Sequence, residues 1–193
     1  MVPWLSGASF HYPRYVIETD WLEHAPFVFW LVDAVRPSTL VELGTTDGYS
    51  YLALCQAVEF SGLKAECYSI QLPGWDTKVD NPDRVREELK QANAEYSFFS
   101  NLSQSTTEKT FARFADGAID LLHVRQDGLG EDVRDVLEKW TPRLSDKAVL
   151  LLSVGSETSG ANDVQDVLNI VGDRFPAFAF PGGGGLVAIG VGA

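Results

Sequence analysis

The residues with the clearest chemical potential lie in the stretch Val41-Glu42-Leu43-Gly44-Thr45-Thr46-Asp47-Gly48-Tyr49-Ser50. An apolar strand expected over residues 39–43 leads into two glycines four positions apart, after which a helix is expected. Glycine lets a backbone turn sharply and approach a ligand closely, and the first N–H groups of a helix are free to bind one. Together with the acidic Glu42 near the strand's end, this pattern predicts a small-molecule site at the carboxyl end of the strand.

Two further side chains could take part in chemistry as a general base. His123 lies near the end of a later apolar segment, and Asp127 follows it closely in the sequence. An imidazole changes charge near neutral pH, and either group can accept a proton from a bound substrate. Each also has a purely structural interpretation, His123 as a strand-end histidine with satisfied hydrogen bonds and Asp127-Gly128 as a turn.

Metal and disulfide chemistry have little support in the sequence. Cys55 and Cys67 each fall in a largely apolar stretch, and two cysteines imply no disulfide framework. His11 and His24 are too far apart for a metal-ligand spacing, and there is no Cys/His cluster. We therefore expect no metal site. The Gly-x-Ser-x-Gly motif of acyl-transfer enzymes is absent as well.

Length and composition bound the remaining possibilities. The chain has 193 residues, which suits one domain with a full hydrophobic core, and we expect a single domain over residues 1–193 with an irregular segment at 1–17. The net charge of −12 repels phosphate backbones and anionic membranes, so we expect no nucleic-acid partner. Neither a membrane span nor a signal peptide is evident, which favours a cytoplasmic protein.

Strand-like and helix-like segments alternate along the chain. Strands are expected at 39–43, 65–71, 96–99, 118–124 and 147–153, and helices at 20–35, 49–59, 82–94, 107–114, 132–140 and 161–175. This alternation predicts a mostly parallel sheet covered on both faces, and right-handed crossovers make it a doubly wound α/β fold. Two last strands, 177–180 and 186–191, flank Pro181 and four glycines and predict a C-terminal antiparallel hairpin.

The spacing Glu42-x-Gly44-x-x-x-Gly48 resembles motif I of the class I S-adenosylmethionine (SAM)-dependent methyltransferases. It is unlike the Gly-x-Gly-x-x-Gly dinucleotide motif or a phosphate loop. Residues 41–50, together with residues 116–123 and 140–146, resemble the sequences of a small bacterial branch of this family, often encoded with glycosyltransferases and polysaccharide genes. The resemblance implies a Rossmann-like fold, SAM as cofactor and a sugar or glycan-linked acceptor. It also implies a glycosyltransferase partner or another domain of a longer chain, and leaves a homo-oligomer open.

The same resemblance implies roles for the residues of the glycine motif. Gly44 and Gly48 would let the backbone approach the methionine end of SAM, and Glu42 would hold its ammonium group, directly or through water. Thr45, Asp47 and Ser50 would lie nearby.

Three positions at strand ends depart from the family pattern. Where the family carries an acid for the ribose hydroxyls, this chain has Gln71, a weaker neutral acceptor, with Asp76 as a substitute farther along the loop. Arg125 stands where an acid is expected, and Asp127 could replace that acid through a small shift. Leu152-Ser153 stands in place of a His-Asp pair. These changes open an alternative to methyl transfer, a non-catalytic pseudo-methyltransferase that serves as a binding or scaffold domain in polysaccharide assembly.

Overall fold

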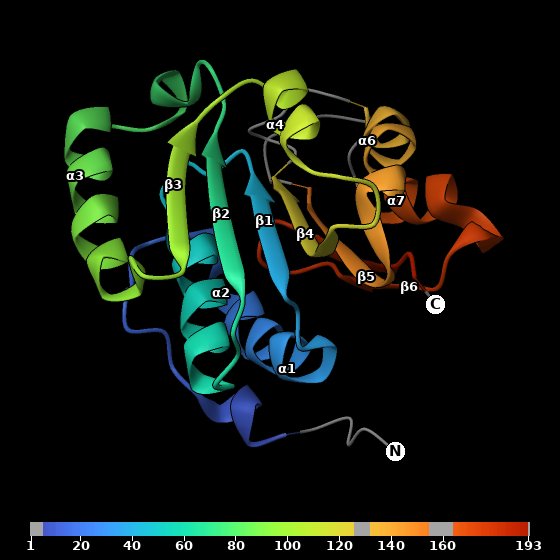
Figure 1. Cartoon of the computed structure of the whole chain (residues 1–193), viewed down its shortest axis with the longest axis horizontal. Helices are drawn as coiled ribbons and strands as arrows, with labels where there is room; N and C mark the ends of the chain where they lie inside the picture. Colours follow the sequence, from blue (N-terminus) through green and yellow to red (C-terminus); the bar gives the residue numbers. More distant parts are fainter. Residues whose placement is uncertain (1–5, 126–131, 155–163, 193) are drawn as a thin grey trace.

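The computed structural model describes residues 6–125, 132–154 and 164–192 (Figure 1). The strands are β1 Thr39–Leu43, β2 Glu66–Gln71, β3 Ser100–Gln104, β4 Ile119–Arg125, β5 Leu144–Ser153, β6 Ala177–Phe180 and β7 Leu186–Gly190. The α-helices are α1 Ala25–Val35, α2 Tyr49–Phe60, α3 Pro82–Asn93, α4 Thr107–Arg113, α6 Val133–Trp140 and α7 Val164–Val171. Short 3-10 helices are η1 Gly7–Phe10, η2 Asp20–His24, η3 Trp75–Lys78, η4 Ala94–Tyr96, η5 Thr141–Arg143 and η6 Gly172–Arg174.

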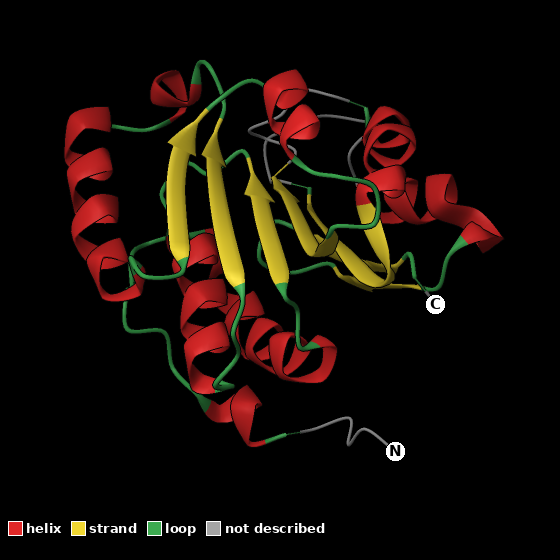
Figure 2. Ribbon diagram, in the orientation of Figure 1, coloured by secondary structure: helices red, strands yellow, loops and turns green. Residues whose placement is uncertain are grey.

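The seven strands form one sheet in the order β3-β2-β1-β4-β5-β7-β6, with helices packed around it (Figure 2). The first five strands pair in parallel, whereas β7 runs antiparallel to both β5 and β6. This arrangement confirms the predicted doubly wound, Rossmann-like sheet with an antiparallel C-terminal hairpin. Because all the parallel strands end at the same edge, their terminal side chains are brought together there.

Two hydrophobic layers hold the helices against the sheet. One layer joins α1 and α2 to one face and contains Phe29, Tyr51 and Leu54, all fully buried. The other layer joins α6 and α7 to the opposite face around the buried Trp140 and Val167. Every residue of β4 is buried, its three polar residues included, which fits a central strand that is covered on both faces.

Local sequence signals explain where most helices begin. Pro26 occupies the first turn of α1, where its missing N–H has no cost, and the predicted helix over 20–35 is therefore a 3-10 turn followed by α1. Thr106 and Asp132 cap α4 and α6 by accepting a backbone N–H with their side chains. In contrast, Gly48 begins α2 without a side-chain cap.

The third strand was predicted at 96–99 and this prediction is wrong, because β3 begins at Ser100. The N–H of Phe99 donates to the carbonyl of Tyr96 and closes a turn, and the carbonyl of Phe99 accepts the N–H of Cys67 where the chain enters β3. β3 is an edge strand of mostly polar residues, which the hydrophobic pattern does not reveal. The described part of the last predicted helix, 161–175, consists of α7 and η6, and its start lies outside the described residues.

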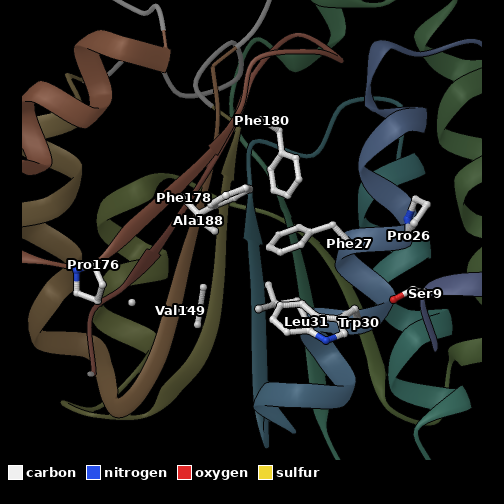
Figure 3. Close-up of a pocket in the computed structure, with 11 residues that line it drawn as sticks. Ser9, Pro26, Phe27, Trp30, Leu31, Val149, Pro176, Phe178, Phe180 and Ala188 are labelled. Atoms are coloured by element: carbon white, nitrogen blue, oxygen red, sulfur yellow. The ribbon is translucent and has the colours of Figure 1, made fainter. Parts of the chain in front are cut away.

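An apolar groove of about 740 Å³ lies between α1 and the β6–β7 hairpin (Figure 3). Phe27 and Trp30 of α1 face Phe178 and Phe180 of β6 across it, and none of its lining residues is charged. α7 packs on β6 and β7, and its buried side chains belong to the layer on the other face of the sheet. Phe178 is 62% exposed. The described residues that line the groove come from α1, η1 and the strand side, and none of them belongs to α7. The groove is thus an open apolar surface on the α1 side of the sheet.

The glycine loop of the hairpin packs tightly against η2. A Cβ atom at Gly183 would lie 2.6 Å from the carbonyl oxygen of Asp20 and 2.7 Å from Nε2 of His24. That same imidazole nitrogen lies 3.0 Å from the carbonyl oxygen of Gly183. The loop thereby fixes η2 beside the carboxyl end of β5, where Trp21 enters the site.

Candidate functional site

The site is built on the neighbouring carboxyl ends of β1, β4 and β5. Glu42 of β1 pairs in register with His123 of β4, so their side chains emerge on the same face of the sheet. Arg125, at the end of β4, pairs with Ser153 at the end of β5. Strand order and register therefore gather four polar side chains from distant parts of the sequence.

The carboxylate of Glu42 is fully buried and accepts hydrogen bonds from three protein groups. Its Oε1 accepts from Thr45 Oγ1 at 2.8 Å, and its Oε2 accepts from Ser50 Oγ at 2.7 Å. Nδ1 of His123 lies 2.7 Å from the same Oε2. Burial acts to raise the pKa of Glu42, but the hydrogen bond and charge of His123, with smaller effects of Arg125 and Ser50, outweigh it. The pKa of Glu42 is therefore held below its ordinary value, and the group is a carboxylate.

The polar contacts continue from His123 to β5 and η2. Nε2 of His123 lies 2.7 Å from Ser153 Oγ, and the indole N–H of Trp21 donates to the same oxygen at 2.9 Å. His123 is fully buried, whereas Ser153 retains 6% exposure. A continuous series of hydrogen bonds thus runs from Trp21 through Ser153 and His123 to Glu42.

The loop between β1 and α2 carries the two glycines of the motif in left-handed backbone conformations. Gly44 has φ 82° and Gly48 has φ 84°, a region that side chains rarely adopt. The N–H of Gly44 donates to the carbonyl of Ile70 at 3.0 Å, which ties the loop to β2. Asp47 accepts the N–H of Tyr49 at 2.8 Å through its side chain. The loop is thereby held as a rigid backbone surface at the start of α2.

Gly48 is also required by packing. A Cβ atom at this position would lie 2.5 Å from Cδ1 of Leu89, a buried residue of α3. The glycine therefore serves the contact between the loop and α3, independently of any ligand.

Two buried donors near the end of β2 have no hydrogen-bond partner within the described part of the chain. They are Nε2 of Gln71 and the indole N–H of Trp75. Trp75 itself is packed, with the guanidinium of Arg86 5.3 Å from its ring centre. Asp76, the predicted substitute for Gln71, is exposed in η3. Unpaired buried donors are rare in native proteins, and these two fit a ligand rich in acceptor atoms.

Arg125 places a positive charge at the end of β4, where the sequence led us to look for an acid. Its guanidinium lies 3.4 Å from Oδ2 of Asp47, which links β4 to the glycine loop. Asp127 lies outside the described residues. Among the residues that the structure describes, no group of three His, Cys, Asp or Glu side chains could hold a metal ion.

Of the predicted site residues, the structure brings together Glu42, Gly44, Thr45, Asp47, Gly48, Ser50 and His123, while Gln71 lies at the end of the adjacent β2. The sequence did not indicate Ser153 as the partner of His123, or Trp21 as the donor to Ser153. The available signal was the position of Ser153 as a polar residue ending an apolar strand. The pairing itself depends on register, which the sequence pattern does not give.

Known proteins resemble this chain in both sequence and structure. A family model described as a methyltransferase domain matches residues 41–153, more than half of the chain. The chain is 36% identical over 132 residues to the uncharacterized protein y4gI of Sinorhizobium fredii (strain NBRC 101917 / NGR234). That match covers 68% of this chain but only 14% of the relative, so the chain corresponds to a small part of that protein.

Solved methyltransferases share the architecture. A methyltransferase from Geobacter sulfurreducens aligns with a TM-score of 0.66 and 17% identity over 92% of this chain and 82% of its own. An O-methyltransferase from Bacillus cereus in complex with SAH aligns with a TM-score of 0.59 and 15% identity, over 92% and 84% of the two chains. TomG, an O-methyltransferase from Streptomyces achromogenes in complex with SAM, gives 0.56 and 14%, over 92% and 82%. At these identities the likeness concerns the fold.

Proposed function

The chain belongs to the methyltransferase-domain family, and on that premise we propose that it binds SAM and transfers its methyl group to a small-molecule acceptor. The observation that carries the proposal is the β1–α2 loop, in which Gly44 and Gly48 hold left-handed conformations above a buried carboxylate. SAM, when bound, supplies an electrophilic methyl group on a sulfonium ion. Positioning of the acceptor can then provide much of the rate acceleration.

We propose a separate role in cofactor binding for each residue of the loop. Gly44 and Gly48 leave the backbone open to the methionine end. Glu42 accepts hydrogen bonds from Thr45, Ser50 and His123, so we propose that it shapes the loop and holds the ammonium group of SAM through water. Asp47 would act from the rim of the same loop.

The ribose end is assigned to β2. Gln71 offers an amide oxygen and an unpaired buried N–H to the ribose hydroxyls, and Trp75 offers an unpaired indole N–H nearby in sequence. These donors support a fit to adenosine, which carries several acceptor atoms. Asp76 is exposed and stands as the second choice for this role.

The acceptor side of the proposal is a sugar or glycan-linked compound, with His123 or Asp127 as the base. The resemblance of residues 116–123 and 140–146 to the polysaccharide-associated branch supports this acceptor class. A glycosyltransferase or another domain of a longer chain is the proposed partner, since the matched relative is much longer than this chain. A cytoplasmic location and a homo-oligomer complete the proposal. No described helix is both long and apolar enough to cross a membrane.

Arg125 favours a second candidate function, a non-catalytic methyltransferase-like module. Its guanidinium pairs with Asp47 and cannot serve as a base or a metal ligand. A module of this kind would keep the fold for binding or scaffolding within polysaccharide assembly and would be indifferent to SAM.

Calorimetric titration with SAM and with S-adenosylhomocysteine tests the first function against the second. The informative variant is Gly44→Ala, which adds a methyl group where the backbone would approach the cofactor. Gly62→Ala is the matched control, because Gly62 also has a positive φ, of 59°, but borders open space at the far end of α2. Both variants carry the same kind of backbone strain, about 1 kcal/mol.

We expect micromolar binding by the wild type and by Gly62→Ala, with Gly44→Ala weakened at least tenfold. Absence of heat and of thermal stabilisation with the wild type at millimolar cofactor would refute the methyltransferase function and support the scaffold. Equal weakening in both glycine variants would show that strain, and not the loop surface, controls binding.

A further inference from the structure

We propose that Ser153 takes the proton of the acceptor and gives its own hydroxyl proton to His123, so that the group methylated is a hydroxyl. This inference rests on the proposed methyl transfer and names the acceptor chemistry of the same site. Ser153 ends β5 at the carboxyl edge of the sheet, 2.7 Å from Nε2 of His123. Ser153 would be the catalytic residue, and His123 and Glu42 would act through it as positioning residues.

The direction of the hydrogen bonds follows from the donors available. Glu42, as a carboxylate, can only accept, so its 2.7 Å contact with His123 requires the proton on Nδ1. The relay works from the neutral form of the imidazole, in which Nε2 is bare and accepts the hydroxyl proton of Ser153. The remaining donor, the indole of Trp21, points at Ser153 Oγ from 2.9 Å. The series therefore runs in one direction, Trp21 to Ser153 to His123 to Glu42.

This pattern leaves one lone pair on Ser153 Oγ for a ligand. A hydroxyl oxygen has two lone pairs, and the indole N–H occupies one of them. His123 and Glu42 are both fully buried, so neither can meet an acceptor, whereas Ser153 keeps 6% exposure. The proton of an acceptor would thus reach the imidazole by way of the serine.

The proton transfer balances without any further reagent. The acceptor O–H gives its proton to Ser153 Oγ, and the hydroxyl proton of Ser153 moves to Nε2 of His123. The acceptor oxygen, carrying the freed electron pair, forms the bond to the methyl carbon, and the electron pair of the broken carbon–sulfur bond stays on sulfur. His123 ends as an imidazolium beside the Glu42 carboxylate, and the proton later leaves to solvent by the reverse path.

The charges around the series suit this end state. The carboxylate of Glu42 lies against Nδ1 and stabilises the imidazolium, because opposite charges attract strongly where water is excluded. After transfer, Ser153 Oγ accepts from both Trp21 and His123, and its new proton points toward the acceptor oxygen. Every polar atom of the series therefore has a partner in both states.

The same geometry would also suit a nucleophilic serine, and the two roles are separable. A nucleophile attacks through a lone pair of the oxygen and forms a covalent adduct. A fluorophosphonate probe reports such a nucleophile directly, since it labels an activated serine irreversibly. Labelling of Ser153 in the full chain would overturn the relay.

The main experiment compares O-methylation and S-methylation in serine variants. The hydroxyl probes are a panel of free sugars and nucleotide sugars, and the thiol probe is 1-thioglucose, assayed with SAM at about pH 9, where a thiol ionises without a base. Ser153→Ala removes the relay, Ser153→Thr keeps a hydroxyl, and Ser100→Ala removes a comparably buried hydroxyl at the start of β3. Calorimetry with SAM and circular dichroism accompany each variant.

We expect Ser153→Ala to lose about 100-fold or more of the O-methylation rate, with S-methylation and SAM affinity unchanged. Ser153→Thr and Ser100→Ala should both retain O-methylation. Equal O-methylation by Ser153→Ala and the wild type, or transfer by the wild type to the thiol alone, would overturn the relay while SAM binding stays intact. Loss of SAM binding by the wild type would instead refute the proposed function itself.

Discussion

The contact between Gly48 and Leu89 yields a prediction that separates packing from cofactor binding. Gly48→Ala puts a side chain at φ 84°, which costs about 1 kcal/mol. It also places a Cβ atom 2.5 Å from Leu89 Cδ1, and relieving that overlap by moving one buried leucine costs about 1 kcal/mol. We therefore expect Gly48→Ala to lower the free energy of unfolding by about 2 kcal/mol.

Urea denaturation of Gly48→Ala, Leu89→Ala and the double variant separates the backbone cost of the alanine from the cost of its overlap with Leu89. Leu89→Ala alone should cost about 3 kcal/mol, because Leu89 is buried in the layer between the helices and the sheet. It also removes the atom with which the new Cβ would overlap. The double variant should therefore be about 1 kcal/mol more stable than the sum of the single changes. Gly62→Ala, which has a positive φ and open space, is the control and should show the backbone part alone.

Strict additivity of Gly48→Ala and Leu89→Ala would refute this reasoning, since it would mean that the two positions do not meet. A Gly48→Ala variant no less stable than Gly62→Ala would refute it as well. If the three variants behave as expected, loss of SAM binding in a Gly48 variant has two explanations, because the new side chain displaces α3 as well as facing the cofactor. Gly44 is then the better position for testing the cofactor.

Three further predictions concern single side chains. Trp21→Phe removes the indole donor of Ser153 and should lower the free energy of unfolding by about 1 kcal/mol in urea titration; a change near zero would mean that the bond contributes nothing. Burial acts to raise the pKa of Asp120, but hydrogen bonds from Ser145 and two backbone N–H groups, with the charge of a lysine, outweigh it and hold the pKa below its ordinary value. Its stabilising effect is therefore present above about pH 4 and is lost as the pH falls through the lower folded pKa. In Asp120→Asn the acid-induced decline in urea stability should be shallower, and an unchanged decline would contradict the assignment. Gln71→Glu restores a charged acceptor and should tighten SAM binding several-fold in calorimetry, whereas weaker binding would place the ribose elsewhere.

The fold was predictable because the signals for it are local. Strands rich in apolar residues alternate with helices that begin at Pro82 or directly after the capping residues Thr106 and Asp132, and each signal acts within a few residues. The third strand escaped because its residues are polar and the aromatic residues before it form a turn. An edge strand needs little hydrophobic surface, so its pattern is weak.

The candidate site was only partly predictable. Glu42, Gly44 and Gly48 lie within one short motif, and their positions follow from the chain itself. The contacts of His123 with Glu42 and Ser153 join three strands, so they depend on strand order and register. The packing of Gly48 on Leu89 depends in the same way on where α3 lies. Such contacts are properties of the folded molecule, and no spacing in the sequence encodes them.

The open apolar groove beside Phe178 affects how the stability of this protein should be measured. Fluorescent dyes used in thermal-shift assays brighten when they bind apolar surfaces. The folded protein already has an apolar groove of about 740 Å³ that such a dye could enter. The dye signal should therefore start high and change little, or even fall, as the protein unfolds. Trp30 lines the same groove, so its emission would report a bound dye as well as unfolding. Far-ultraviolet circular dichroism, which follows the backbone, is the sounder readout for every variant described above.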